Sequence, residues 1–341
     1  MLVGITGAGG FIGGRLAPAL AARGDRLRCL VRSRARTGEL GGEELSAALG
    51  DGRLELVEGD LRAREEGPAR RGLETFAEGL DAVVHLAGLT RARNPLEFWR
   101  VNAGGTKRLA EALRKGSPRL GRLVVLSTFG VHGPSSGPGD FAVEEGPRRP
   151  LDPYARSKLA MEAWLEGGAG DLPWTLLRPV PVYGPGDRDF LELFRWASRG
   201  LGLGFGRGES LVSMTFVDNL VDAILLALER PEALHEAFLV ADVHLSHRGI
   251  AALAAGALGR STTFVELPPA LASLASLADE LASGLSGRPA LLSRHKLREL
   301  SWPWWLASSD KARSLLGWEP RVPPAEAFAA TLLWYEARGL L

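Results

Sequence analysis

Short apolar runs alternate with longer amphipathic stretches through the first half of the chain. The apolar runs are LVGIT at residues 2–6, LRCLV at 27–31, LELVEG at 54–59, AVVHLAG at 82–88 and RLVVLST at 122–128. Helical patterns over residues 11–23 and 95–115 lie between some of them. Continuous apolar runs suit strands that are covered on both faces, so the alternation predicts repeated β-α-β units around a parallel sheet.

The regular alternation ends at about residue 171. Turns rich in Pro and Gly then surround short strands such as WTLLRP, and residues 264–302 are rich in Leu and Ala. We therefore expect an α/β fold, a doubly wound parallel sheet of the Rossmann type with a smaller, interleaved C-terminal subdomain. The dinucleotide-binding domain is expected at 1–170, with segments returning at about 212–245, and the substrate-binding subdomain at 171–211 and 246–341.

Charge and cysteine content narrow the kinds of partner. The 341 residues include 41 Lys and Arg against 40 Asp and Glu, so no broad positive field favours a nucleic acid or an anionic membrane. No run of about 18 apolar residues suggests membrane insertion. A single cysteine, Cys29, and scattered histidines indicate no metal site and fit a reducing cytoplasm. We expect a cytoplasmic protein that acts on a small molecule.

Three glycines follow the first predicted strand at a GxxGxxG spacing and open a helix. Gly7 permits a tight turn, Gly10 lets the backbone approach a pyrophosphate, and Gly13 allows close packing of the helix on the strand. Phe11 and Ile12 complete this loop. The pattern predicts a binding site for a dinucleotide phosphate.

The second and third predicted strands end in residues that bear on the choice of cofactor. Arg32 stands where a fold that prefers NAD usually has an acid, and with Ser33 or Arg34 it could pair with a 2′-phosphate. We therefore expect NADP in preference to NAD, the alternative being that the arginines form a solvated basic loop. Asp60 and Leu61 follow the third strand and could border the adenine.

Tyr154 and Lys158 lie four residues apart on a predicted helix that starts near Pro153, and therefore on one face. A phenol with a pKa near about 10 is a poor base at neutral pH, but an adjacent ammonium favours the phenolate. Thr128, at the end of a predicted strand, could polarise a carbonyl. The pattern predicts acid-base catalysis. The alternatives are a surface pair on a helix and a hydroxyl that satisfies backbone groups.

Together these segments resemble the extended short-chain dehydrogenase/reductase family, also called the NAD-dependent epimerase/dehydratase family. The resemblance covers nearly the whole chain through TGAGGFIG, HLAG, VNAGGTKRLAEAL, LST followed by FGVHG, PYARSKLAMEAW, LLRPVPVYGPGD, TFVDNLVDAIL and KARSLLGWEPRV, in that order. It implies that Thr128, Tyr154 and Lys158 form a catalytic triad, with Lys158 also binding the nicotinamide ribose.

The resemblance implies roles for further residues. Leu86, Ala87 and Gly88 would line the cofactor, and Pro181 would pack against the nicotinamide. Asn102 would help to hold the site and a water molecule. Relatives of this kind are usually homodimers, formed through the helices that carry Asn102 and Tyr154.

Two departures from the family pattern bear on the substrate. Nucleotide-sugar enzymes of the family carry an arginine that binds the diphosphate, in an RDFI-like run, where this chain has VSMT at 212–215. Arg207 or Arg178 could substitute for it. His132 replaces the tyrosine of the family's VYG motif.

The second strand and the Trp-rich C-terminal third instead resemble the branch of 3-beta-hydroxysteroid dehydrogenases and dihydroflavonol reductases, which favour apolar substrates. Trp302, Trp304 and Trp305 could form a pocket wall or simply pack in the core.

The expected reaction is the interconversion of a secondary alcohol and a ketone on a small, apolar substrate, with Tyr154 as the general acid and base. Two alternatives stay open. One is a nucleotide-sugar epimerase or dehydratase that keeps NAD tightly bound. The other is a non-catalytic NADP-binding sensor or scaffold.

Overall fold

The computed structural model describes residues 1–33, 50, 52–63, 67–205, 210–267 and 302–341. Two arginines that the sequence singled out, Arg34 and Arg207, lie outside the described residues, as does most of the Leu- and Ala-rich stretch before Trp302.

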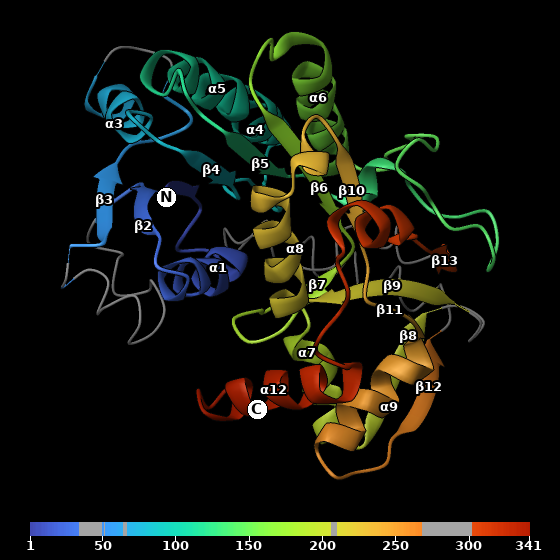
Figure 1. Ribbon diagram of the computed structural model, residues 1–341. Coiled ribbons are helices and arrows are strands. Elements are labelled where there is room, and N and C mark those ends of the chain that lie inside the picture. Colours follow the sequence, from blue (N-terminus) through green and yellow to red (C-terminus); the bar gives the residue numbers. More distant parts are fainter. Residues whose placement is uncertain (34–49, 51, 64–66, 206–209, 268–301) are drawn as a thin grey trace.

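A seven-stranded sheet forms the centre of the larger part, in the order β10-β6-β5-β4-β1-β2-β3 (Figure 1). Its strands are β1 (Leu2–Thr6), β2 (Arg26–Val31), β3 (Leu54–Glu58), β4 (Ala82–His85), β5 (Arg122–Leu126), β6 (Trp174–Pro179) and β10 (Ala237–Val240). All neighbouring strands pair in parallel. The strand order reverses between β1 and β4, and ligands of such sheets bind at the carboxyl ends of the strands beside that point.

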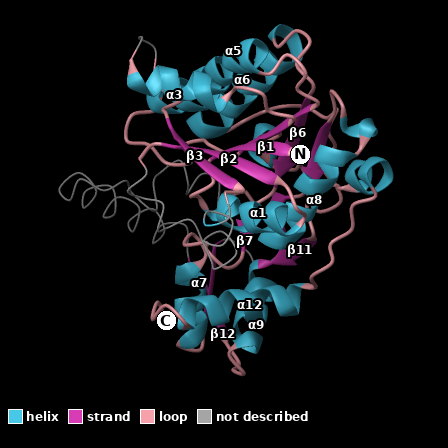
Figure 2. Cartoon of the chain, turned by 60° about the vertical axis from the view of Figure 1, so that its left-hand side comes forward, coloured by secondary structure: helices cyan, strands magenta, loops and turns pink. Residues whose placement is uncertain are grey.

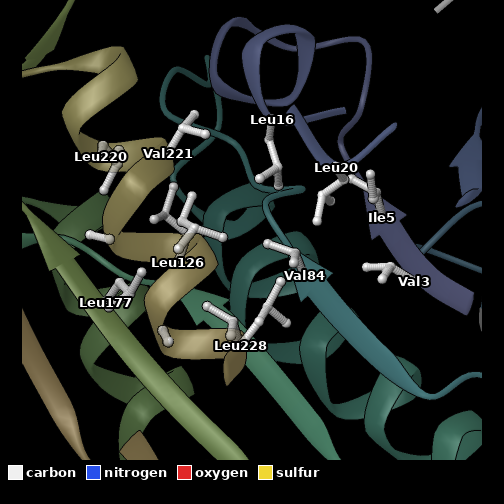
Figure 3. Close-up of a cluster of buried hydrophobic side chains, with 14 of the residues drawn as sticks. Val3, Ile5, Leu16, Leu20, Val84, Leu126, Leu177, Leu220, Val221 and Leu228 are labelled. Atoms are coloured by element: carbon white, nitrogen blue, oxygen red, sulfur yellow. The ribbon is translucent and has the colours of Figure 1, made fainter. Parts of the chain in front are cut away.

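Helices cover both faces of this sheet, which confirms the predicted doubly wound fold. One face is covered by α1 (Phe11–Ala22) and α8 (Val217–Glu229), and the other by α3 (Pro68–Phe76), α5 (Gly104–Gly116) and α6 (Pro153–Gly168). Figure 3 shows Leu16 of α1 and Leu220 of α8 directed toward buried side chains of the strands. The central strands β1, β4 and β5 are therefore buried on both faces, whereas β2 and β3 at the edge alternate with charged residues.

Short helical turns complete the larger part. The segment α4 (Leu96–Phe98) and a π-helical turn at Trp99–Ala103 run directly into α5. A 3-10 turn at Phe129–Val131 follows β5, another spans Pro231–Ala233, and a second π-helical turn spans Ala312–Leu316.

Within the described residues, the smaller part carries two short sheets and three helices. In the first sheet β9 (Leu211–Phe216) pairs with β11 (Val243–Ser246), β13 (Trp304–Trp305) and β7 (Val182–Tyr183); in the second β8 (Leu201–Phe205) pairs with β12 (Thr263–Leu267). The helices are α7 (Leu191–Ser198), α9 (His247–Ala257) and α12 (Pro324–Glu336). Figure 2 shows these helices grouped at one end, away from α3, α5 and α6.

The chain passes between the two parts more than once. The larger sheet takes β6 and β10 from beyond residue 170, while an aromatic core of its own, including Tyr183, Phe194 and Phe328, fills the smaller part. A substrate-binding role for the smaller part stays a prediction. No helix among the described residues is long and apolar enough to cross a lipid bilayer.

Candidate active site

The glycine loop joins β1 to α1 and lies directly against the end of β4. Gly7 has a φ of +79°, and a Cβ added there would stand 2.8 Å from the amide nitrogen of Ala87. A Cβ on Gly13 would stand 2.2 Å from the carbonyl oxygen of Gly7. Side chains at these two positions would therefore collide with backbone, which explains why glycine occupies them.

The first turn of α1 offers its amides to a ligand. Gly10 precedes the helix with extended backbone angles, no side chain caps it, and no acidic residue stands in the first turn. A helix start of this kind carries unpaired amide donors and a partial positive charge, which suits a phosphate. The loop therefore fits the pyrophosphate of a dinucleotide.

Phe11 and Ile12 pack partly buried beside this loop. A Cβ on Gly186, in the segment after β7, would stand 3.1 Å from the Cδ2 atom of the Phe11 ring. Arg91, after β4, and Asp189 form an ion pair of 2.5 Å. The segments that follow β4 and β7 thus meet near the glycine loop.

Arg32, Asp60 and Leu61 lie at the ends of the adjacent strands β2 and β3. Arg32 is exposed, and Asp60 pairs with Arg62 at 2.7 Å. Burial raises the pKa of Asp60, but its hydrogen bonds to Arg62 and the charges of Arg62 and Arg32 outweigh burial and hold that pKa below its usual value. Leu61 is buried against Gly105 of α5. The sequence singled out Arg32 but missed Arg62, a second cation at this edge.

The predicted catalytic pair, Tyr154 and Lys158, lies in the first turns of α6. The Asp152 carboxylate accepts a hydrogen bond of 2.8 Å from the amide of Ala155, and Pro153 occupies the first helical turn. This start directs Lys158 inward, where its Nζ atom donates to the carbonyl oxygen of Leu126 at 2.7 Å. The Tyr154 ring packs edge-on against Phe98, with the ring centroids 6.0 Å apart.

Thr128 caps the turn that follows β5. Its Oγ1 atom accepts a hydrogen bond of 3.1 Å from the amide of Gly130, and the hydroxyl proton stays available for donation. A Cβ on Gly130 would stand 3.4 Å from both this oxygen and the Cβ of Ala155. The turn therefore lies on α6 next to Tyr154, and the structure brings the three predicted catalytic residues to one place.

Asn102 joins the cofactor side of the site to α6. Its side chain exchanges hydrogen bonds with both backbone groups of Leu89 and donates to Ser157 at 2.9 Å. The Ser157 hydroxyl in turn donates to the carbonyl of Tyr154 at 2.6 Å. Both amide protons of Asn102 are thereby used within the protein, and its role is to hold the two segments together.

Residues 86–88 lie between the glycine loop and Lys158 and are called the cofactor wall below. The Leu86 amide donates to the carbonyl of Thr6 at 3.1 Å, and Ala87 touches Gly7. A Cβ on Gly88 would stand 3.3 Å from the Nζ atom of Lys158. Pro181 is exposed in the link from β6 to β7, where its carbonyl accepts from the amide of Thr215; its contact with nicotinamide stays a prediction.

A buried ion pair lies one helical turn beyond Lys158. Glu162 receives two hydrogen bonds from Arg178, of 3.0 and 2.9 Å, and neither side chain is exposed. The Ser127 hydroxyl also donates to Glu162. Burial lowers the pKa of Lys158 to about 8, while the charge of Glu162 acts to raise it. The sequence analysis missed Glu162, although it continues the helix face of Tyr154 and Lys158 at the next i+4 position.

The suggestion that Arg178 could bind a substrate diphosphate is wrong. Its guanidinium is fully buried between Glu162, the carbonyl of Glu144 and the ring of His132. Burial, with the charge of Arg178, lowers the pKa of His132 to about 4, so its neutral Nε2 atom accepts from Arg178. His132 therefore serves this network.

The C-terminal tryptophans differ in their surroundings. Trp302 is 44% exposed, whereas Trp305 is half-buried and packs edge-on against Phe129 at 6.0 Å between ring centroids. Phe129 follows Thr128 directly, so Trp305 lies close to the catalytic turn. Among the described residues, no group of three or more His, Cys, Asp or Glu side chains could hold a metal ion.

Comparison with known proteins agrees with this geometry. The sequence model of the NAD dependent epimerase/dehydratase family matches residues 3–241. The ceramide reductase of Caulobacter vibrioides is 31% identical over 342 residues, covering 100% of this chain and 96% of that protein. A 4-hydroxy-2-methyl-3-oxo-4-farnesyl-3,4-dihydroquinoline-1-oxide ketoreductase of Stigmatella aurantiaca is 30% identical over 338 residues, covering 93% of this chain and 92% of the ketoreductase.

A solved structure shows the same fold. The UDP-glucose 4-epimerase of Thermotoga maritima, determined with UDP-glucose, superposes with a TM-score of 0.76 at 21% identity, covering 99% of each chain. The protein belongs to the NAD-dependent epimerase/dehydratase family, the extended type of short-chain dehydrogenase/reductase. It is an enzyme of this type, whose members include reductases and epimerases.

Gly13→Ala tests the glycine loop. We expect loss of nicotinamide dinucleotide binding, because the new Cβ would stand 2.7 Å from the Cα of Ala8 as well as against Gly7. Gly14→Ala is the matched control, since nothing lies within 4 Å of a Cβ there. Fluorescence titration with NADH and NADPH measures both variants, and equal affinity for the two variants would contradict this placement of the phosphate.

The ionisation of Lys158 predicts a limit to activity at alkaline pH. The ammonium is present well below its pKa of about 8 and is lost as the pH rises through that value. Turnover that depends on this charge should fall about tenfold per pH unit above the limit. Glu162→Gln should lower turnover at every pH, because it leaves the buried Arg178 without its charged partner, and should also move the fall to lower pH, because it removes the charge that favours the ammonium. The control Glu166→Gln, one turn further along α6, should leave it in place, and identical profiles for the two variants would contradict the assignment.

Proposed function

We propose that the enzyme is an NADP-dependent reductase that interconverts a ketone and a secondary alcohol on a small, apolar substrate. The observation that carries the proposal is the position of the Lys158 ammonium, held by the carbonyl of Leu126 beside Gly88 and one helical turn from Tyr154. This position supplies a fixed positive charge where a phenol must transfer a proton.

Each residue of the triad has a distinct task in the reduction. The bound cofactor supplies the hydride to the carbonyl carbon. Tyr154 donates its hydroxyl proton to the carbonyl oxygen, so that hydride and proton together convert the ketone to the alcohol. Thr128 donates a hydrogen bond to the same oxygen, and Lys158 stabilises the phenolate until Tyr154 regains a proton from solvent. The oxidation of an alcohol reverses these steps.

Apolar surroundings support an apolar substrate. Phe98 lies against Tyr154, and Trp305 packs on Phe129 beside Thr128. Arg178 is committed to its buried partner and is not available to a diphosphate. The two similar reductases, by their names, act on a ceramide and on a farnesyl-substituted ring. A bulky hydrocarbon next to the reacting ketone fits all of these observations.

Arg32 and Arg62 support the preference for NADP. Both guanidinium groups act on Asp60 at the edge of the sheet where the adenosine ribose of such folds binds. A 2′-phosphate there would meet the exposed guanidinium of Arg32, with Arg62 close by in its ion pair with Asp60.

An epimerase or dehydratase with internal redox chemistry is the second candidate, and the matching family model favours it because the family includes such enzymes. The intact triad argues against a non-catalytic sensor or scaffold. A homodimer in the cytoplasm also stays a prediction.

Tyr154→Phe tests the catalytic assignment. We expect turnover with ketones to fall by at least about a hundredfold, because the variant lacks the proton that the carbonyl oxygen receives. Affinity for NADPH should stay within about twofold. Tyr335→Phe removes the same atom from the core of the smaller part and should leave turnover unchanged. Full activity in Tyr154→Phe would refute the mechanism.

Arg32→Ala tests the choice of cofactor. Loss of a charge-assisted contact to a phosphate should weaken NADPH binding about tenfold or more, and NADH binding much less. Arg26→Ala, at the opposite end of β2, provides the control. Calorimetric titration of both cofactors gives the comparison, and an equal loss for NADH and NADPH would remove the case for a 2′-phosphate site.

A further inference from the structure

His85 stands at the carboxyl end of β4, between the glycine loop and the helix that carries Asn102. Its ring is 2% exposed. The Nδ1 atom lies 2.6 Å from the hydroxyl of Thr6, the residue before Gly7, and the Nε2 atom lies 2.8 Å from the hydroxyl of Thr106 in α5. The ring thus spans the distance between two elements on either side of its own strand.

These contacts belong to a series of hydrogen bonds in which each donor and acceptor can be assigned. The Thr106 hydroxyl donates to the carbonyl of Asn102 at 2.6 Å, so its oxygen must accept from the Nε2–H group of His85. The Nδ1 atom of a neutral ring is then an acceptor, and the Thr6 hydroxyl donates to it. The oxygen of Thr6 accepts from the amide of Ala87 at 3.2 Å. The bonds run one way, from Ala87 through Thr6, His85 and Thr106 to Asn102.

The arrangement requires a neutral imidazole. A second ring proton would put a donor on Nδ1, and the Thr6 hydroxyl would then lose the acceptor of its own proton. Burial and the nearby charge of Lys158 lower the pKa of His85 to about 3, so the ring stays neutral at physiological pH.

The two ends of this series of hydrogen bonds, Ala87 and Asn102, lie at the cofactor wall and at the catalytic helix α6. Ala87 touches Gly7 and leads into Gly88, beside Lys158. Asn102 holds Leu89 and, through Ser157, the first turn of α6. We infer that His85 is a positioning residue that holds the cofactor wall, residues 86–88, in register with Tyr154 and Lys158. This inference rests on the proposed function for its catalytic part only.

Two substitutions of His85 test its hydrogen bonds to Thr6 and to Thr106 separately. His85→Asn can place an acceptor near the position of Nδ1 and keep the Thr6 bond, whereas His85→Gln can place a donor near the position of Nε2 and keep the Thr106 bond. We expect His85→Gln to weaken NADPH binding about tenfold, since the Ala87 end loses its support. We expect His85→Asn to keep that affinity within about threefold and to lower kcat about tenfold, since the Asn102 end is released.

Smaller changes repeat the test if either variant fails to fold. Thr6→Val should behave as His85→Gln, and Thr106→Val as His85→Asn. Thr175→Val is the matched control, because Thr175 is an equally buried threonine with two hydrogen bonds in the same sheet, away from the site. It should lower Tm without changing the affinity for NADPH.

Titration with NADPH alone and turnover with a ketone form the two arms of the experiment. The inference would be overturned if the variants of His85, Thr6 and Thr106 have a lower Tm, as Thr175→Val does, but keep the Kd and kcat of the wild type. His85 would then be a structural residue only. If wild type reduces no ketone, the proposed function fails, while a tenfold change of Kd in His85→Gln and Thr6→Val still supports the role of His85 at the cofactor wall.

Discussion

The ion pair between Arg178 and Glu162 lies wholly inside the protein, and the geometry of the active site depends on it. Arg178 belongs to β6 and Glu162 to α6, so the pair fixes the catalytic helix on the sheet. Removing one partner of a buried pair typically costs about 3–5 kcal/mol, because the other charge is left without compensation. The ring of His132 and the hydroxyl of Ser127 satisfy further polar atoms of the pair. A buried charge is acceptable under these conditions only.

The residues at the end of β5 contact both the ion pair and the predicted catalytic side chains. Three consecutive residues are involved: the carbonyl of Leu126 binds Lys158, the hydroxyl of Ser127 binds Glu162, and Thr128 caps the turn beside Tyr154. Three turns of α6 are thereby held against the last residue of β5 and the two residues that follow it. A shift of either element would change the distance between Tyr154 and Lys158, which the proposed acid-base chemistry requires to be fixed.

The parts of the fold that could be predicted from sequence are those fixed by local patterns. Apolar runs identified β1 to β5 of the parallel sheet, whereas the segment that contains β6 was assigned to the smaller subdomain. The spacing of the glycines predicted the loop, and the structure shows that a Cβ on Gly7 or Gly13 would collide with backbone. The i, i+4 spacing correctly placed Tyr154 and Lys158 on one helix, α6, while their catalytic role stays a prediction. The partners of Arg178 and His85 come from elements far apart in the chain, so no local pattern revealed them, and Arg178 was wrongly offered as a ligand for a substrate.

Transfer of deuterium tests the central claim that the enzyme performs net reduction. Purified protein is given NADPH carrying deuterium at nicotinamide C4, on either face in separate reactions, together with candidate apolar ketones or with UDP-glucose, and the products are analysed by mass spectrometry. The account predicts an alcohol that carries one deuterium at the former carbonyl carbon, with NADPH from one face only, and an equal amount of NADP formed. A parallel reaction gives UDP-glucose together with NAD, the oxidised cofactor that internal redox chemistry needs. Isomerised UDP-glucose there without net formation of NADH, and no reduction of any ketone by NADPH, would contradict the account and identify an epimerase.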